Sequence, residues 1–414
     1  MQVSTSPQRT SGRIWARAVA GSALLGLAGV VLAAYTYSEV LGGSIDTDGA
    51  SVSADGTRVA WREFGSGGTS SIKVRYGGTT YTVSGSLDNV GRPRISRDGL
   101  YVAFYGATGS GSSRFPYGVK IGNSPVQLGV FHGGDTPPAV SDDLGNGTAR
   151  YCFYDTYNVP SRIPLGPPEY TSLVVEDAGT SSGSKTPITW YSNHLIAGTE
   201  PAITTDGETV FFTSSDEIRV SEYSSLTGWT VSSDIVSSGS SGPSNGDSRD
   251  ASCSADGRYV AFASQGSNLD SGDAGGNFDV FVRDRTAATL TRAYTGSGGS
   301  TGIGGWDAEG IEISSDGSYV AFFSGSTDIL DLEFCDTMQE YIEETVFVSD
   351  WANQSVEAVS FMPDGEGDPA CFLNGTFPSI SQDADHIGFQ SDTPGIVSGD
   401  NDGYKHALHK YDHT

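Results

Sequence analysis

The stretch SADGRYVAF, residues 254–262, contains a pattern that recurs along the chain. In the clearest copies, an Asp-Gly pair is followed by two variable residues, a Val and two residues that are small or aromatic. These copies begin at Asp55, Asp98, Asp206, Asp256 and Asp316. A weaker copy begins at Asp383, and residues 143–153 form a copy with a lengthened turn, so the 414 residues contain seven related units.

Each copy is typical of a β-hairpin. An Asp-Gly pair supplies the positive-φ positions of a two-residue turn, and the β-branched and aromatic residues after it form a buried strand. A third strand is expected in each unit, at residues 72–75, 117–121, 172–176, 218–222, 279–284, 345–350 and 406–412. A fourth is expected in the first six units, for example at 289–293 and 355–360. Four antiparallel strands in each of seven units predict an all-β fold, a seven-bladed β-propeller, with six or eight blades as the alternatives.

The seventh unit ends at Thr414 and has no room for a fourth strand. Residues 37–41 precede the first unit and have no partner within it. We expect this N-terminal segment to complete the seventh blade, because closing the ring removes exposed sheet edges. Residues 35–414 then form a single propeller domain.

The N-terminus has the features of an export signal. Arg9, Arg13 and Arg17 precede an uncharged, mostly apolar run at residues 18–34, with small residues suited to cleavage after Ala33 or Ala34. The alternative is a retained anchor, because a bilayer span needs roughly 17 to 25 residues. We expect residues 1–34 to be a signal peptide and the protein to be secreted, periplasmic or held in the cell envelope.

The chain is strongly acidic. Fifty Asp and Glu residues against 23 Lys and Arg give a net charge of −27. This field repels phosphate backbones and anionic headgroups, so nucleic acid and membrane surfaces are excluded as partners apart from an N-terminal anchor. We expect a soluble monomer that binds a protein or glycan outside the cytoplasm.

Residues 254–264, followed by FDVFVRD at 278–284, closely resemble the repeat of TolB-type, WD-repeat-like β-propeller proteins of bacterial envelopes. The resemblance covers essentially the whole chain after residue 35 and implies a propeller fold and export. TolB itself is expected to have six blades and a separate N-terminal domain, whereas seven units here begin close to the predicted cleavage site. The partners of TolB are therefore not transferred to this chain.

Long connections between the second and third strands are the expected functional loops, because a four-stranded blade places them all on one face. They lie at residues 156–169, 265–277, 327–344 and 393–404, and ordinary connections have about 2 to 6 residues. The connection at 327–344 has no Lys or Arg and contains the candidate ligand-face residues Asp328, Asp331, Glu333, Asp336, Glu340, Glu343 and Glu344. This acidic segment is expected to attract a basic partner or a divalent cation; the alternative is a solvated acidic loop.

Two of these loops also suggest calcium. Hard oxygen ligands at short spacings occur at Asp270, Asp273, Asn277 and Asp279, and at Asp400 and Asp402 beside Asn401. Neither loop matches a complete EF-hand, and the same residues are common in plain turns. Calcium is the one cofactor that the sequence suggests.

Four cysteines in an exported chain favour disulfide formation. Cys335 and Cys371 lie in connections expected on the same face, and we predict a disulfide between them. Cys152 and Cys253 lie in strands of blades that are not neighbours, so we predict buried free thiols.

Catalytic motifs are weak. Gly-x-Ser-x-Gly occurs around Ser181 and Ser300, but in Ser/Gly-rich loops rather than between a strand and a helix. No catalytic residue is assigned. The preferred hypothesis is an exported, non-catalytic binding or scaffold propeller with an acidic loop face; the alternatives are a polysaccharide hydrolase or lyase, or a structural surface or matrix protein.

Overall fold

The computed structural model describes a defined part of the chain. The described residues are 35–39, 46–108, 113–129, 136–158, 169–181, 183, 185–190, 194–195, 199–271, 277–294, 310–325, 329, 344–362, 371–372, 375–391 and 407–413. The predicted signal peptide, residues 1–34, lies outside them. Within them, all regular secondary structure is β, and no helix long and apolar enough to cross a bilayer is found.

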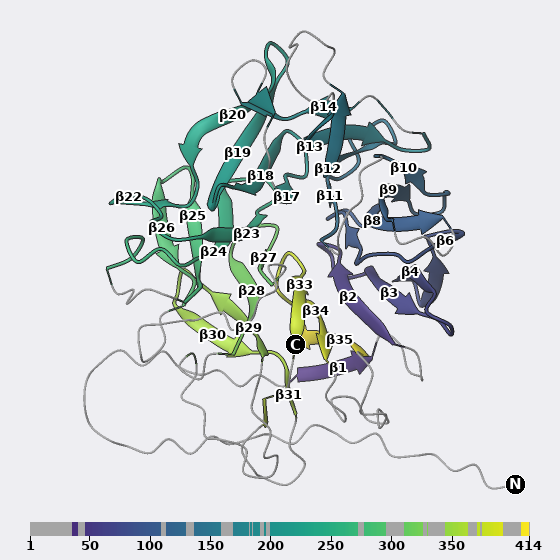
Figure 1. The fold of residues 1–414 in the computed structure, drawn as a ribbon. Helices are drawn as coiled ribbons and strands as arrows, with labels where there is room; N and C mark the ends of the chain where they lie inside the picture. Colours follow the sequence, from purple (N-terminus) through teal and green to yellow (C-terminus); the bar gives the residue numbers. More distant parts are fainter. Residues whose placement is uncertain are drawn as a thin grey trace, which may run out of the picture.

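Seven sheets of four or more strands lie around a common centre in the described part of the chain (Figure 1). The first contains β2 (Thr47–Val52), β3 (Val59–Phe64), β4 (Ser70–Tyr76) and β5 (Thr79–Thr82). The second contains β6 (Leu87–Asp88), β7 (Arg94–Ile95), β8 (Tyr101–Thr108), β9 (Phe115–Lys120) and β10 (Val126–Gln127). The third contains β11 (Ala139–Val140), β12 (Ala149–Asn158), β13 (Glu169–Ala178) and β14 (Thr186–Pro187).

The remaining sheets follow the same order from the centre outward. The fourth contains β17 (Thr199–Ile203), β18 (Thr209–Ser214), β19 (Glu217–Ser224) and β20 (Gly228–Ile235), extended by β15 (Thr189–Trp190) and β16 (His194–Leu195). The fifth contains β23 (Ser248–Cys253), β24 (Tyr259–Ser264), β25 (Asp279–Asp284) and β26 (Thr289–Arg292). The sixth contains β27 (Glu312–Ile313), β28 (Tyr319–Ser324), β29 (Thr345–Asp350) and β30 (Ser355–Ala358). Two short ladders, β21 (Ser238–Gly239) with β22 (Gly242–Pro243) and β31 (Phe361–Met362) with β32 (Cys371–Phe372), stand apart from these sheets.

The seventh sheet joins the two ends of the chain. It contains β33 (Thr376–Ile380), β34 (His386–Ser391), β35 (Ala407–His413) and the N-terminal strand β1 (Tyr35–Glu39). β1 pairs antiparallel with β35, from Tyr35 opposite His413 to Glu39 opposite His409. The predicted closure by the N-terminal segment is confirmed, with the strand two residues earlier than expected. The all-β propeller is confirmed with it.

The core lies between neighbouring sheets. One cluster joins Val280 and Val282 of the fifth sheet to Phe322 and Phe347 of the sixth, all at most 1% exposed. These residues alternate along their strands because successive side chains point to opposite faces. Burying each large side chain contributes roughly 1.5–3 kcal/mol, which holds adjacent sheets face to face.

The turns differ from the predicted two-residue form. In the fifth sheet the Ser254 amide donates to the Tyr259 carbonyl (2.8 Å) and the Gly257 amide to the Ser254 carbonyl (3.0 Å), leaving four residues in the loop. Gly257 has a φ of +68°, whereas Asp256 is not in the left-handed region. The Asp acts through its carboxylate instead: it accepts hydrogen bonds from the Ser254 hydroxyl (2.7 Å) and the Arg258 amide (3.0 Å). The prediction of positive φ at both turn residues was therefore wrong.

One predicted loop is partly strand. Residues 156–169 were expected to form a connection, but β12 and β13 stay paired as far as Asn158 opposite Glu169. The added register consists of the backbone pairs Thr156–Thr171, Tyr157–Tyr170 and Asn158–Glu169. Thr and Tyr are residue types enriched in strands, which favours a hairpin longer than the repeat pattern indicated.

Candidate functional site

The innermost strands and their turns place three positions of the repeat around the central axis. Counted back from each turn Asp, these are the fourth, the third and the first residue before it. The cavity at the axis has a volume of about 50 Å³ and is lined by residues of all seven sheets. Ten of the fifteen lining residues are apolar, among them Val52, Ile95, Val140, Ile203 and Ile380, but the surface that faces the cavity is mainly polar.

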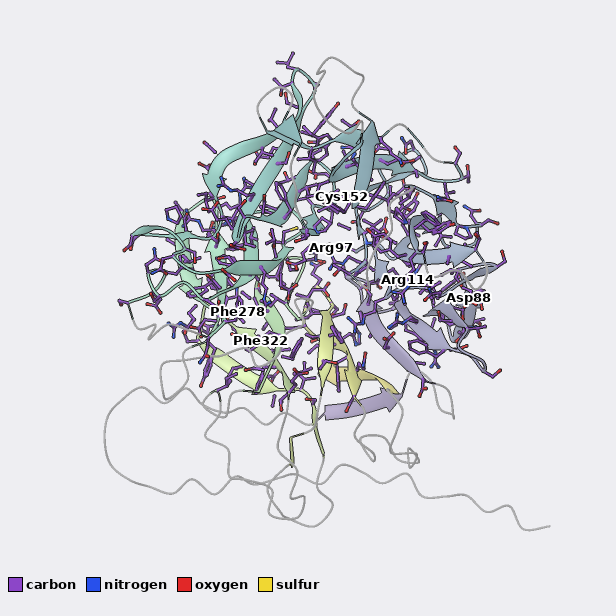
Figure 2. All side chains as sticks on the ribbon, viewed as in Figure 1. Asp88, Arg97, Arg114, Cys152, Phe278 and Phe322 are labelled. Atoms are coloured by element: carbon purple, nitrogen blue, oxygen red, sulfur yellow. The ribbon has the colours of Figure 1, made fainter. Side chains whose placement is uncertain are left out.

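Three charged side chains line this cavity: Arg94, Arg97 and Glu312. Arg94 extends from β7 of the second sheet, and its Nη1 donates to the Pro201 carbonyl of the fourth sheet (3.0 Å). Arg97, labelled near the centre of Figure 2, donates from Nη1 to the Ser315 hydroxyl (2.7 Å) and from Nη2 to the Cys253 carbonyl. The two guanidinium groups therefore tie the second sheet to sheets across the axis.

The cavity changes the acidity of its titratable groups. Burial raises the pKa of the Glu312 carboxyl above its usual value, while the positive charges of Arg94 and Arg97 and a hydrogen bond with Ser379 oppose that rise. Burial also raises the pKa of the Cys253 thiol to about 11, again opposed by Arg97 and Arg94. The pKa of Glu312 is thus set by two opposing effects, burial and the charges of Arg94 and Arg97.

Backbone hydrogen bonds join the turns of neighbouring sheets around the axis. The amide of Ala54 donates to the Arg97 carbonyl (2.8 Å), and that of Gln382 to the Ala54 carbonyl (2.8 Å). On the other side, the amides of Asp142, Thr205 and Ala255 donate in succession to the carbonyls of Thr205, Ala255 and Ser315 (3.1, 3.0 and 2.8 Å). These bonds fix the turn end of the cavity, so Arg97 extends from a well-anchored backbone.

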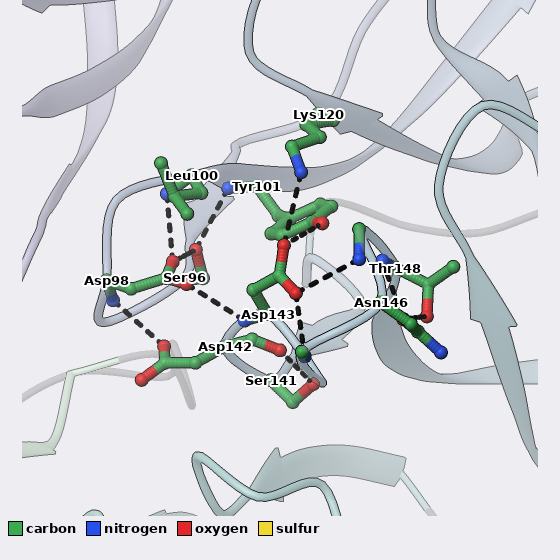
Figure 3. Close-up of polar contacts among 12 residues, drawn as sticks. Ser96, Asp98, Leu100, Tyr101, Lys120, Ser141, Asp142, Asp143, Asn146 and Thr148 are labelled. Carbon is green, nitrogen blue, oxygen red and sulfur yellow. Dashed lines mark hydrogen bonds and ion pairs between the residues drawn. The ribbon is translucent and has the colours of Figure 1, made fainter.

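The contact between the second and third sheets has its own polar network (Figure 3). Asp142 accepts a hydrogen bond from the Asp98 amide (2.9 Å), and Asp98 accepts one from the Asp143 amide (2.8 Å). Asp143 accepts from the Tyr101 hydroxyl (2.7 Å) and from Lys120 Nζ (3.1 Å). The network joins the two turns through both backbone and side chains.

The two adjacent aspartates have opposite pKa shifts. Burial raises the pKa of Asp142 to about 6, an effect that its hydrogen bonds and the charge of Arg97 only partly oppose. The hydrogen bond from Tyr101, followed by that from Lys120, lowers the pKa of Asp143 to about 2. The pKa of Asp142 thus lies well above that of Asp143, its neighbour in the chain.

The residues predicted as an acidic ligand face are mostly beyond the described part of the chain. Glu344 directly precedes β29, and its carbonyl accepts a hydrogen bond from the Gly375 amide (2.8 Å). The other six, Asp328, Asp331, Glu333, Asp336, Glu340 and Glu343, lie outside the described residues. The acidic segment therefore stays a prediction, because residues 329 and 344 are the only ones of 327–344 that the structure describes.

The predicted calcium ligands of the fifth sheet lie beside a buried arginine. Arg292 Nε is 3.4 Å from Asp270 Oδ2, and Arg292 Nη2 is 4.0 Å from Asp279 Oδ2. Asn277 lies at the start of the segment that leads into β25, while Asp273, Asp400 and Asp402 lie outside the described residues. No group of three His, Cys, Asp or Glu residues suited to a metal ion occurs among the residues described.

The cysteine predictions fare differently. Cys152 and Cys253 are free and buried, as predicted. Burial raises the pKa of the Cys152 thiol strongly. Cys335 lies outside the described residues, and Cys371 is placed only as backbone in β32, so their disulfide stays a prediction.

Comparisons with known proteins relate this chain to others by fold. No family model and no curated protein matches the sequence. An oligogalacturonate lyase in complex with manganese is similar in structure, with 12% identity and a TM-score of 0.54 over 93% of this chain and 95% of that one. An oligogalacturonate lyase from Vibrio parahaemolyticus has 11% identity and a TM-score of 0.51 over 93% and 98%. TolB from Acinetobacter baumannii has 15% identity and a TM-score of 0.37 over 61% and 55%.

At such low identity these similarities show a β-propeller fold. The two lyase structures, with TM-scores above 0.5, match the fold over 93% of this chain. The activity of this chain has to be inferred from its own residues.

Proposed function

We propose that the chain is an exported, non-catalytic recognition module, a propeller with one blade for each of its seven sheets, that binds through the acidic segment at residues 327–344. The observation that carries this proposal is that the strands on both sides of the segment are paired and buried where the segment begins and ends. Ser324 at the end of β28 and Thr345 at the start of β29 are paired and almost fully buried. The acidic insertion therefore begins and ends at one rigid point of the scaffold.

The segment has one further anchor. Ile329, just inside it, is 1% exposed and packs in the cluster between the fifth and sixth sheets. The insertion leaves β28 at the end opposite its Asp-Gly turn, away from the hydrogen-bonded turns around the axis. A loop on a rigid scaffold is where recognition concentrates, and its seven acidic residues without Lys or Arg select a basic ligand.

The chemistry of the insertion favours a protein partner rich in Lys and Arg. Rim charges of this kind steer association and make binding sensitive to salt. The TolB-like propellers among the structural matches and the N-terminal Arg residues before an apolar run support an extracytoplasmic site of action. Sequencing the N-terminus of protein from the host envelope tests export: a start at residue 34 or 35 supports it, and an intact residue 1 opposes it.

The binding test uses residues 35–414 and a variant of equal length with the seven acids of 327–344 changed to Asn or Gln. We expect an Arg- and Lys-rich peptide to bind the parent domain in calorimetry, more weakly at high salt, and to lose binding in the variant. A second variant with Asp400 and Asp402 changed to Asn controls for loss of overall negative charge. Equal binding by the parent and the first variant would overturn the proposal.

The same proteins separate the enzymatic alternative. A polysaccharide hydrolase or lyase would release reducing ends or unsaturated products from a glycan panel, and the seven substitutions would have to abolish that turnover. Product formation without peptide binding replaces the recognition role with the enzymatic one.

A calcium site is a separate part of the proposal. In the fifth sheet, calcium would have to compete with Arg292 for Asp270 and Asp279. Millimolar calcium should raise the melting temperature relative to chelator, and Asp402→Asn or Asp270→Asn should remove the rise for the loop that holds the ion. An unchanged melting temperature in the parent protein excludes the site.

A further inference from the structure

The central cavity holds more positive than negative charge among its lining residues. Two guanidinium groups, from Arg94 and Arg97, face one carboxylate, from Glu312. The hydrogen bonds of both arginines go to neutral oxygens: the carbonyls of Pro201 and Cys253, and the Ser315 hydroxyl. Among the described residues, neither arginine has a carboxylate within ion-pair distance.

A fourth charged group stands beside the cavity without lining it. Asp142 is close enough for its charge to interact with Arg97, but its carboxylate accepts the Asp98 amide at the contact between the second and third sheets. It therefore reduces the positive potential at Arg97 but does not form an ion pair with it. Each Arg97 Nη carries a second N–H besides the one that donates to Ser315 or Cys253.

Electrostatic contacts are stronger inside a protein than in water, because the effective dielectric is lower there. The surface that faces the cavity is mainly polar, and its charged groups are Arg94, Arg97 and Glu312. A guanidinium presents paired N–H donors whose spacing matches the two oxygens of a carboxylate. The Ser252 and Ser315 hydroxyls, which also line the cavity, add neutral donors.

The size of the cavity sets the class of ligand. Its volume is about 50 Å³. One water occupies roughly 10–15 Å³ on this measure, so there is room for a few water-sized groups and none for a sugar or a nucleotide.

We propose that the central cavity binds a small carboxylate anion, of the size of formate or acetate, between Arg94 and Arg97. The site is independent of the acidic segment at residues 327–344 and lies at the axis of the ring. The anion supplies the negative charge that the two arginines lack, and Glu312 limits its affinity by repulsion.

The test measures thermal unfolding of residues 35–414 in acetate, formate or chloride against sodium gluconate of equal ionic strength, because gluconate is too large for the cavity. Acetate and formate should raise the melting temperature saturably. If chloride alone raises the melting temperature, the ligand is a halide and the proposed carboxylate is wrong. No rise over gluconate with any of the three would overturn the proposal.

Three substitutions locate the effect. Arg94→Gln and Arg97→Gln should abolish the acetate-dependent rise. Arg58→Gln is the matched control, because Arg58 also donates to a backbone carbonyl (Gly99, 2.7 Å) but does not line the cavity. An equal rise in the Arg94 and Arg97 variants would contradict the assignment.

Glu312→Gln provides a test that does not depend on loss of stability. Removing the repelling carboxylate should tighten acetate binding by about tenfold, measured by calorimetry or by 13C NMR of labelled acetate. Unchanged or weaker binding in this variant would show that the anion does not lie beside Glu312.

Discussion

The turns after the innermost strands are of two kinds. In six sheets the turn satisfies its own aspartate: the Ser or Thr two residues earlier donates its hydroxyl to that Asp, as Ser314 does to Asp316 at 2.7 Å. In the third sheet the Ser141 hydroxyl donates instead to the Asp142 carbonyl (2.9 Å). Asp143 is then free to accept from Tyr101 and Lys120 of the second sheet (Figure 3).

This difference shows how one repeat can serve two structural purposes. We call a turn self-contained when its own Ser or Thr hydroxyl donates to the turn Asp. In such a turn the glycine lacks a side chain, so a side chain of the preceding sheet can pack directly against its backbone, as Tyr259 does at Gly317. In the longer third turn Gly145 faces open space and Gly147 meets only Lys120 Nζ at 3.6 Å. This turn contacts the second sheet through charged and polar side chains instead. Van der Waals packing therefore stabilises the contact between the sixth turn and the fifth sheet. Hydrogen bonds stabilise the contact between the third turn and the second sheet.

The largest expected effect is that of adding a methyl group to a self-contained turn. In Gly317→Ala the new Cβ would lie 2.2 Å from the Tyr259 ring, at a φ of +81° that disfavours alanine. We expect a loss of about 2–4 kcal/mol in the free energy of unfolding, measured with urea. Gly147→Ala in the third turn is the matched control: its φ is +79°, but its nearest neighbour is the flexible Lys120 Nζ at 3.6 Å. Equal losses in the two variants would mean that backbone strain, not packing against the preceding sheet, dominates.

The next effect tests the hydrogen bonds of the third turn. Tyr101→Phe removes the 2.7 Å bond to Asp143 from a side chain that is 0% exposed. We expect a loss of about 1–2 kcal/mol, because Asp143 keeps Lys120 and two turn amides. A double-mutant cycle with Asp143→Asn should give a favourable coupling between the two side chains. Strictly additive losses would show that this bond does not hold the two sheets together.

The two aspartates of the third turn should give opposite pH dependences. The pKa of Asp142 is raised to about 6 from 3.8, so between these values the native state holds a proton that the unfolded chain has lost. The contribution of Asp142 to stability therefore falls as pH rises through this window, and Asp142→Asn should gain in melting temperature relative to wild type between about pH 4 and 6.

Asp143 is the control for that experiment. Its pKa is lowered to about 2, so its contribution is present above about pH 4 and is lost as pH falls toward 2. Asp143→Asn should therefore lose melting temperature relative to wild type as pH rises from 2 to 4. The same sign of pH dependence in both variants would contradict the assigned environments.

The smallest effect concerns the seventh turn, where alanine replaces the usual glycine. Ala384 has a φ of +62° and is buried in a hydrophobic cluster. In Ala384→Gly, relief of about 1 kcal/mol of backbone strain is offset by loss of a buried methyl worth about 0.8 kcal/mol, so stability should change little. Ala288→Gly, at a φ of +56° on an exposed turn, should stabilise by about 1 kcal/mol in the same urea titration. A gain at Ala384 as large as that at Ala288 would mean that its methyl contributes nothing to packing.

The strands could be predicted well because each copy of the repeat places them at similar distances from its turn Asp. β25 and β29 have the predicted bounds, since each contains a Val-Phe-Val run flanked by polar residues. The turn geometry was missed because the Asp-Gly pair was interpreted by backbone preference alone. The Ser or Thr two residues before each Asp was the available signal, because its hydroxyl and the Asp carboxylate close the loop.

The charged groups at the axis were missed for a different reason. Arg94 and Glu312 occupy the repeat position that holds Ser51, Ser252 and Ser379 in other sheets, and Arg97 the position of Ala54 and Ala255. Aligning the copies on their Asp residues would have shown Arg94 and Glu312 at a position that holds Ser or Ala in the other five copies. That these positions face one cavity could not be predicted without the closed ring.

The pairing of β1 with β35 also determines when folding can finish. The first strand among the described residues has its partner in β35, from Tyr35 opposite His413 onward. Contacts of such high sequence separation form late, because a long loop must first be closed. A nascent chain that stops before β35 leaves β1 without its partner and β34 with an unpaired edge. Such a product exposes an open sheet edge to proteolysis or aggregation, because this sheet closes only after β35 has been synthesised.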